Sequence, residues 1–285
     1  MSLLGLLLVL AAACCHATWN FLVKKINGGP ELIWLFSVLA MILYLPVAVF
    51  IGMRSDFSLG LREVMIMSVS TMLHLGYFLL LQKGYQTGDL SLVYPTARAT
   101  GPLLSGFFAV VMLREDMTLQ MLAGAVAIIV GVLFLSGGFK KRRSHVTASL
   151  AFGLGAGVLI GSYTVWDAYA VSAVLIPPVL LDFSSSIGRS IVLAPIGFKR
   201  WHQVRSHWRL HRIAVIFISI LNPLAYILVL YALTFTPVIY VAPVRESSVL
   251  ISVLMGSVLL NEPAIRQRFG WALLMVIGVA VLATG

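Results

Sequence analysis

Apolar stretches of about 20 residues recur along the whole chain, and short polar or basic segments separate them. A stretch of this length forms a helix that can cross a bilayer. The pattern predicts an all-α polytopic membrane protein. Its ten transmembrane helices are expected at residues 2–23, 31–52, 63–82, 89–113, 117–137, 147–168, 174–198, 212–233, 236–260 and 266–284.

The second half of the chain repeats the first at a constant offset. Arg98 corresponds to Arg245 (245 − 98 = 147), and many apolar, glycine and tryptophan positions follow the same offset. We predict two five-helix repeats, at residues 1–140 and 146–285. Because five spans are an odd number, the second repeat is expected to insert upside down relative to the first. The first span has a counterpart in the second half, so we interpret it as a true span rather than a signal peptide.

Composition supports a membrane protein and gives its orientation. The chain is 60% hydrophobic and 11% charged, whereas soluble domains carry about 25% charged residues. Of the 20 lysines and arginines, 14 lie in loops after odd-numbered spans, 3 lie in the opposite loops, and 3 lie inside spans. Basic loops stay in the cytoplasm, so both termini are expected outside it. The net charge of +10 therefore reflects orientation and does not predict nucleic-acid binding.

Spans 1 and 6 carry equivalent polar and aromatic stripes. His16, Trp19 and Asn20 share one helix face in span 1, and Tyr163, Trp166 and Asp167 repeat the spacing in span 6. We interpret the stripes as the lining of a solute cavity. An aromatic belt at the membrane surface is the alternative.

Spans 3 and 8 add a second set of candidates for the same cavity. Span 3 carries His74 and Tyr77, and span 8 carries Asn222 and Tyr226, with Pro223 as a possible kink. His74 could titrate or donate a hydrogen bond, and a buried, satisfied histidine is the alternative. For Tyr77 and its neighbour Phe78, packing is the favoured alternative.

Spans 4 and 9 each contain one arginine, Arg98 and Arg245, and Tyr94 shares the face of Arg98. A charge at the bilayer centre costs about 2.5 kcal/mol or more, so a function is the default hypothesis. The guanidinium fork matches a carboxylate, phosphate or phosphonate. The alternative is structural: Arg98 pairs with Asp167 or Glu246, and Glu246 neutralises Arg245.

Other charged and small residues have simpler interpretations. Asp182 and Arg189 in span 7 are expected to form a structural pair, directly or through a serine. Glu115 and Glu262 are interpreted as loop boundaries that end a helix. The small residues of spans 5 and 10 predict close packing between the halves.

Several function classes are not supported by any pattern in the sequence. There is no GxxxxGK[ST], HExxH or GxSxG motif, and the adjacent Cys14 and Cys15 have no metal-ligand spacing. We therefore expect no enzyme activity, no cofactor and no bound metal. The expected partners are a small-molecule solute and the lipid bilayer, and the expected state is a monomer.

The segment HATWNFLVKK at the end of span 1 resembles the EamA-like, ten-helix branch of the drug/metabolite transporter superfamily, as does the repeated order of span 4, glutamate and glycine-rich span 5. The chain is most similar to members associated with bacterial phosphonate utilisation. The resemblance implies a bacterial inner-membrane transporter that works by alternating access, with a cavity lined by spans 1, 3, 4, 6, 8 and 9. It also implies that Arg98 and Arg245 match the phosphate-binding positions of plastid sugar-phosphate members.

The chain departs from its relatives in two respects. Many relatives are described with both termini in the cytoplasm, and span 1 lacks the glutamate of the small multidrug exporters, so export of cationic drugs is not expected. We predict a secondary-active transporter of a small anionic or zwitterionic metabolite, such as an amino acid or an organophosphonate. The alternatives are a lipid-phosphate flippase and a membrane-embedded enzyme.

Overall fold

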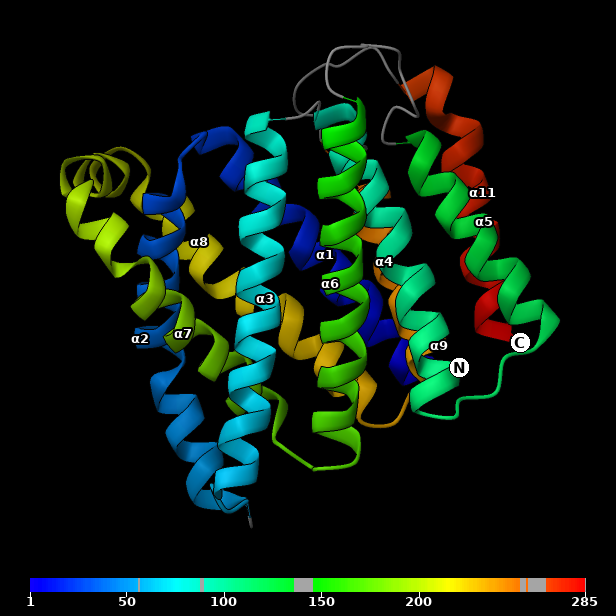
Figure 1. Cartoon of the computed structure of the whole chain (residues 1–285), viewed down its shortest axis with the longest axis horizontal. Coiled ribbons are helices and arrows are strands. Elements are labelled where there is room, and N and C mark those ends of the chain that lie inside the picture. Colours follow the sequence, from blue (N-terminus) through cyan, green and yellow to red (C-terminus); the bar gives the residue numbers. More distant parts are fainter. Residues whose placement is uncertain (56, 88–89, 136–145, 252–254, 256–264, 285) are drawn as a thin grey trace.

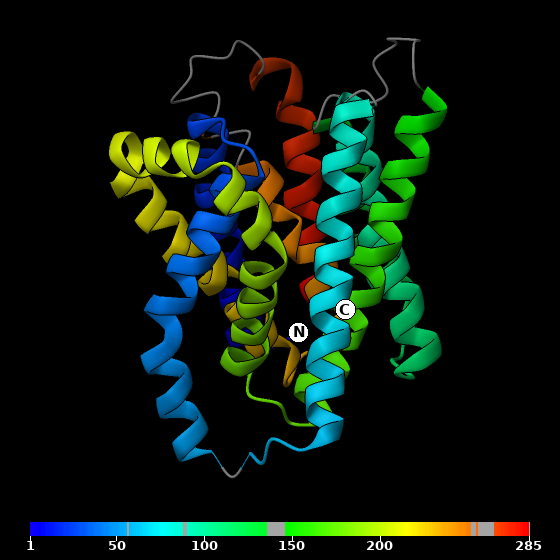
Figure 2. The same ribbon diagram turned by 60° about the vertical axis from the view of Figure 1, so that its left-hand side comes forward.

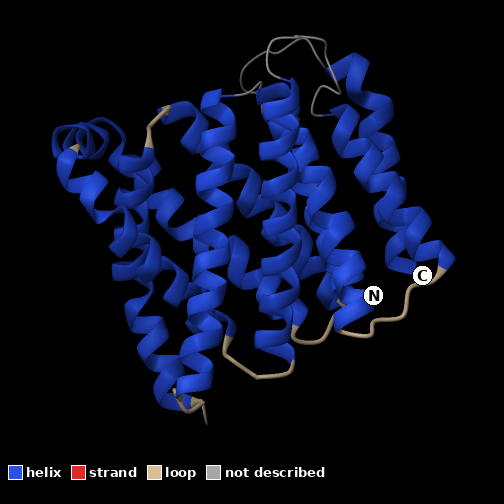
Figure 3. Ribbon diagram, in the orientation of Figure 1, coloured by secondary structure: helices blue, strands red, loops and turns tan. Residues whose placement is uncertain are grey.

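The structure is a computed structural model that describes residues 1–55, 57–87, 90–135, 146–251, 255 and 265–284 (Figure 1). The described residues are helical apart from short connections and form no strand (Figure 3). The helices are α1 (Leu3–Ile26), α2 (Pro30–Arg54), α3 (Leu61–Thr87), α4 (Leu90–Met112), α5 (Leu119–Leu135), α6 (Val146–Ser172), α7 (Pro178–Lys199), α8 (Trp201–Leu233), α9 (Val238–Arg245) and α11 (Ile265–Thr284). Six of them are long and apolar enough, over the described residues, to cross a membrane. The prediction of an all-helical polytopic membrane protein is confirmed.

The helices pack in a pattern that repeats between the two halves. α1 packs on α8 and α9, and its counterpart α6 packs on α3 and α4, which are the counterparts of α8 and α9. α2 packs on its own counterpart α7, and α5 packs on α11. α1 and α6 run in opposite directions through the bundle (Figure 1). This is the arrangement of an inverted repeat, and it brings α1, α3, α4, α6, α8 and α9 together at the centre.

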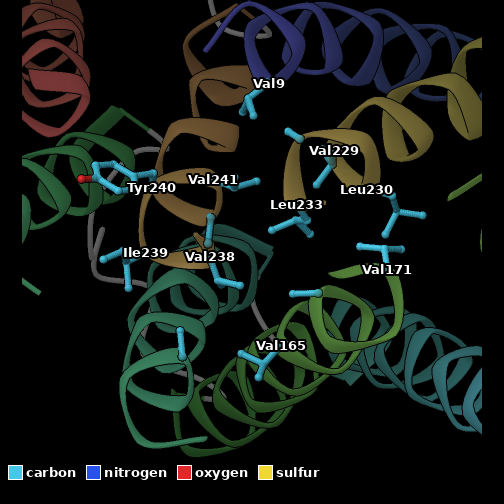
Figure 4. Packing of buried hydrophobic residues seen from close by; sticks show 14 of the residues in the cluster. Val9, Val165, Val171, Val229, Leu230, Leu233, Val238, Ile239, Tyr240 and Val241 are labelled. Atoms are coloured by element: carbon cyan, nitrogen blue, oxygen red, sulfur yellow. The ribbon is translucent and has the colours of Figure 1, made fainter. Parts of the chain in front are cut away.

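Apolar residues from both repeats hold this centre together. Figure 4 shows Val9 of α1, Val165 of α6, Leu230 of α8 and Val241 of α9 in one cluster. All four are fully or almost fully buried. Lipid is as apolar as these side chains, so close packing rather than escape from water fixes the helices.

The α5–α11 pair packs through glycines. A Cβ atom built on Gly124 would lie 2.7 Å from the backbone nitrogen of Leu282, and one on Gly278 would lie 2.9 Å from the backbone oxygen of Gly124. Only a residue without a side chain allows the two backbones to approach this closely. The prediction of close packing between these spans is confirmed.

The predicted span 8, residues 212–233, agrees with the part of α8 that follows a kink. α8 as a whole begins at Trp201, and its backbone leaves helical geometry at His211 (φ −131°, ψ 24°) rather than at Pro223. The first part, residues 201–210, runs across the direction of the other helices (Figure 2). This part is amphipathic and basic, so it has no long apolar stretch from which a helix could be predicted.

Predicted span 9 is interrupted in its middle. α9 ends at Arg245, Glu246 forms a turn, and residues 247–251 are helical again. The amide of Glu246 donates to the carbonyl of Pro243 at 3.0 Å, which is a tightened turn rather than an α-helical bond. The chain breaks its regular hydrogen bonding at the two charged residues, as expected where helices line a site in a membrane protein.

Glu115 does more than end a helix, so the prediction of a simple loop boundary is corrected. Its two carboxylate oxygens accept hydrogen bonds from the amides of Val238, at 2.7 Å, and Ile239, at 3.0 Å. These amides are the unpaired donors at the start of α9. Burial raises the pKa of the Glu115 carboxyl, and the two amide donors oppose that shift. Glu262 lies outside the described residues.

Candidate functional site

Two groups of polar side chains lie on the central helices, within electrostatic range of each other. The aspartate group consists of Asp167 and Tyr163 on α6, His74 and Tyr77 on α3, and Tyr226 on α8. The arginine group consists of His16 and Trp19 on α1, Arg98 on α4, and Arg245 and Glu246 at the break after α9. The groups combine residues from both repeats.

Asp167 is the centre of the aspartate group and is fully buried. Its Oδ2 lies 2.9 Å from Nε2 of His74 and accepts a hydrogen bond from the hydroxyl of Tyr226. Its Oδ1 is also buried, and no described residue gives it a hydrogen bond. A buried carboxylate oxygen without a donor costs about 1–3 kcal/mol or more. This side of the carboxylate is therefore suited to a donor from outside the protein, such as an ammonium group.

Aromatic rings fix the position of His74. The ring of Tyr163 stacks on it with the centroids 4.0 Å apart, and the ring of Tyr226 meets it edge-on at 4.9 Å. Tyr77 contacts Tyr163 edge-on at 5.9 Å. With its ring held in place, His74 can donate from Nε2 to Asp167.

Arg98 forms a buried ion pair that joins the two repeats. Its Nη1 lies 3.2 Å from both carboxylate oxygens of Glu246, and the two side chains are 11% and 1% exposed. Of the alternatives left open by the sequence, Glu246 rather than Asp167 is the partner of Arg98. Glu246 was not among the predicted site residues. Its repeat counterpart is Ala99 (246 − 147 = 99), so an acid that breaks the repeat was the available clue.

His16 lies between two donors. Its Nε2 is 2.9 Å from Nη2 of Arg98, and its Nδ1 is 3.2 Å from Nε1 of Trp19. Guanidinium and indole N–H groups only donate, whereas a neutral imidazole accepts at one nitrogen and donates at the other. The shorter contact, to the charged Arg98, takes the acceptor nitrogen. The indole N–H of Trp19 points at the other ring nitrogen, Nδ1, and one neutral imidazole cannot accept from both donors, so an oxygen acceptor on a solute would take over one of them.

Arg245 is the second cation of the arginine group, and it is 7% exposed. Among the described residues it makes no hydrogen bond and no ion pair. Its charge lies within electrostatic range of Tyr163, Glu246 and Tyr226. The carboxylate of Glu246, its neighbour in sequence, is turned to Arg98 instead. The five donors of Arg245 are thus open to a ligand on the side of the site that adjoins Tyr163 and Tyr226.

Comparison with known proteins gives the family. The model of the EamA-like transporter family matches residues 3–137 and, a second time, residues 147–284. The chain belongs to the EamA-like transporter family. It is therefore a multi-pass membrane protein of a family that transports small solutes.

A solved structure that shares the fold of this EamA-like transporter illustrates the likeness. It is titled only "Crystal structure of protein", and it matches with a TM-score of 0.74 and 15% sequence identity, over 97% of this chain and 95% of the other. At this identity the likeness shows the fold alone. No curated protein matches the sequence significantly. The association with phosphonate utilisation remains a prediction.

Trp166, Asn20 and Asn222 were also predicted site residues, and among the described residues none of them makes a hydrogen bond with a side chain of the two groups. Trp166 donates from Nε1 to the backbone carbonyl of Ile66 at 3.0 Å, so it ties α6 to α3. Asn20 donates to the carbonyl of His16, one turn back, at 2.8 Å. Asn222 is half-buried on α8, and the side chain of Tyr94 lies outside the described residues.

Among the described residues, no hydrogen bond or ion pair forms the predicted Asp182–Arg189 pair. Arg189 donates from Nη2 to Oγ of Ser186 at 3.1 Å. Both lie on α7, which packs mainly on α2 and to a smaller extent on α3 and α8. We therefore leave this pair out of the candidate site.

A pocket of about 360 Å³ lies at the end of the bundle where α2 meets α3 and α6 meets α7. Its charged lining residue, Glu63, accepts a hydrogen bond from the amide of Gly60 at 3.1 Å. The pocket contains none of the residues of the aspartate and arginine groups. It is formed by connections and is not the candidate site.

Proposed function

We propose that this EamA-like transporter is a secondary-active carrier of a small anionic or zwitterionic metabolite, such as an amino acid or an organophosphonate, in the inner membrane. The solute would bind between the arginine group and the aspartate group. Its anionic part would contact Arg245 with His16 and Trp19, and an ammonium group would contact Asp167.

One observation carries this proposal. Arg245 is buried and has no hydrogen bond or ion pair with any described residue, although a buried unpaired charge is costly. A carboxylate or phosphonate on the solute would supply two parallel hydrogen bonds to its fork. The unpartnered Oδ1 of Asp167 adds a complementary demand for a donor. A zwitterion satisfies both requirements with one molecule.

The aromatic rings beside Asp167 suit the same solute. Tyr163 and Tyr226 surround His74 with their rings, and ring faces attract an ammonium group. Hydrogen bonds from the solute would replace those that it loses from water on entering the membrane.

The fold supports alternating access as the mechanism. Inverted repeats permit two states related by exchange of the roles of the two halves, one open to each side of the membrane. The Arg98–Glu246 pair joins α4 of the first repeat to the break after α9 of the second. We propose that this ion pair stays formed while the helices around the solute rearrange.

Counterflow in proteoliposomes tests the proposal. Liposomes loaded with an unlabelled solute would be assayed for uptake of the labelled solute, across amino acids, organophosphonates, monocarboxylates and matched neutral analogues. We expect uptake of at least one anionic or zwitterionic member and none of its neutral analogue. Folded protein that moves no member of the panel, or that moves the neutral analogue equally well, would contradict the proposal.

A further inference from the structure

Residues 201–210 form a short helix that has no part in the candidate site. We call it the cross helix, because it runs across the end of the bundle between α7 and the rest of α8 (Figure 2). It lies at the end where the loop charges predict the cytoplasm. Ten residues are far too few to cross a bilayer.

The cross helix is amphipathic, because it has an apolar face and, next to it around the helix, a basic face. Trp201, Val204 and Trp208 follow the helical spacing i, i+3 and i+7 on an apolar face. A basic face follows the same spacing one residue later and consists of His202, Arg205 and Arg209. A helix with an aromatic face and a basic face is the kind that lies in the plane of a membrane surface.

The apolar face is anchored to the protein at its centre. Val204 is 3% exposed and packs in one cluster with Trp34 of α2 and Leu193 of α7. The ring of Trp201 lies 6.3 Å from that of Trp34, centroid to centroid. Gly197, just before the cross helix, lies against the same indole of Trp34. This packing fixes the direction in which the basic face points.

An acidic residue at the start of α2 holds the inner side of the cross helix. Glu31 accepts from Nη1 of Arg200 at 2.9 Å and lies 3.5 Å from Nε2 of His207. Its carboxylate also accepts from the amide of Gly29 at 2.8 Å. The described partners of Glu31 are therefore Arg200, His207 and one amide, and neither Arg205 nor Arg209 is among them.

The outer basic face has no partner within the described protein. Arg205, Arg209 and Arg212 are exposed, and none of them makes a hydrogen bond or ion pair with a described residue. The sequence contains no aspartate or glutamate between Asp182 and Glu246. A basic surface of this kind is often only solvated. Here, however, large apolar side chains flank it, because Trp201 is 53% and Leu210 is 73% exposed.

We propose that the cross helix lies in the membrane interface and binds the phosphate groups of anionic phospholipids through Arg205 and Arg209. The exposed parts of Trp201 and Leu210 would enter the boundary between head groups and acyl chains, where tryptophan is enriched. Arg205 and Arg209 are four residues apart on one helix, so both positive charges can lie beside the lipid phosphates. Cytoplasmic leaflets carry the anionic lipids that attract such basic segments.

Lipid titration of the full-length protein in detergent, followed by native mass spectrometry, tests the proposal. Phosphatidylglycerol would be compared with phosphatidylcholine of the same acyl chains. Each basic residue near an anionic surface adds roughly fivefold in affinity, so R205Q/R209Q should weaken phosphatidylglycerol binding roughly thirty-fold. Phosphatidylcholine binding should stay unchanged. R205K/R209K keeps the charges and should remain within about threefold of the wild type.

The matched control removes the same charge from the other end of the bundle. R54Q/R62Q changes two exposed arginines there and should keep wild-type phosphatidylglycerol affinity. Equal binding of the two lipids by the wild type, or equal losses in the two double variants, would overturn the proposal. Displacement of phosphatidylglycerol by millimolar inorganic phosphate or glycerol 3-phosphate would also overturn it, because it would show a site for a free anion rather than a membrane surface. Melting in detergent without added lipid checks that the variants are folded.

Discussion

Replacing Arg98 tests whether the Arg98–Glu246 pair holds the two repeats together. Arg98→Met keeps most of the side-chain volume and removes the charge, so the change leaves little cavity. Glu246, which is 1% exposed, would then be a buried carboxylate without its main partner. Removing one member of a buried pair costs about 3–5 kcal/mol.

The structure places the expected loss at the lower end of that range. Arg245 is also within electrostatic range of Glu246 and would compensate part of the lost charge. We expect a loss of about 3 kcal/mol. At roughly 2–4 °C per kcal/mol for a chain of this size, the melting temperature should fall by about 6–12 °C.

Thermal melting in detergent, in a double-mutant cycle, measures this effect. Glu246→Gln in the Arg98→Met background removes the stranded charge and should restore much of the lost stability. Arg245→Met is the matched control, because Arg245 has no ion pair among the described residues; it should melt closer to the wild type. A fall of less than about 2 °C in Arg98→Met, or no rescue in the double variant, would refute the structural role of the pair.

Three further predictions concern the α5–α11 contact, the pKa of Glu115 and the orientation of the chain. Gly278→Ala should lose about 1–3 kcal/mol of stability, because its Cβ would lie 2.9 Å from the Gly124 carbonyl oxygen. In the control Gly270→Ala, on the same helix, the new Cβ meets no atom within 4 Å, so this variant should be neutral or stabilising. Equal melting temperatures of the two variants would show that the α5–α11 contact is looser than described. Because burial raises the pKa of Glu115 in the folded protein, its contribution to stability is present below the unfolded pKa and is lost as pH rises through the folded pKa. The melting temperature of the wild type relative to Glu115→Gln should therefore fall with rising pH, and an increase would mean that the amide bonds outweigh burial. A reporter fused to the C-terminus should be active only outside the cytoplasm, and activity inside would show that the loop charges do not set the topology.

The repeat made much of the fold predictable, but not the difference between the two arginines. Arg98 and Arg245 are equivalent by the 147-residue offset, yet only Arg98 is paired with Glu246. Glu246 is adjacent to Arg245 in sequence, and its choice of Arg98 depends on how α4 and α9 meet across the bundle. Contacts of such long range are set by tertiary packing and are not contained in a local pattern.

Helical spacing was too coarse to separate the aromatic residues of α6. Trp166 and Asp167 follow Tyr163 at i+3 and i+4, and adjacent residues diverge by roughly 100° around a helix. Asp167 therefore faces the centre, while Trp166 reaches the backbone of α3. The cross helix escaped prediction for a related reason, because its apolar residues form a stripe rather than a continuous stretch.

Binding of the transported solute to Arg245→Gln is the most direct test of the proposed site. The measurement is isothermal titration in detergent, with the solute identified by counterflow and with wild-type protein alongside. A charge-assisted hydrogen bond is worth about 1.5–3 kcal/mol, so the account predicts affinity roughly ten- to a hundred-fold weaker in a variant that melts near the wild type. Wild-type affinity in Arg245→Gln would contradict it, because the buried arginine would then have no part in holding the solute.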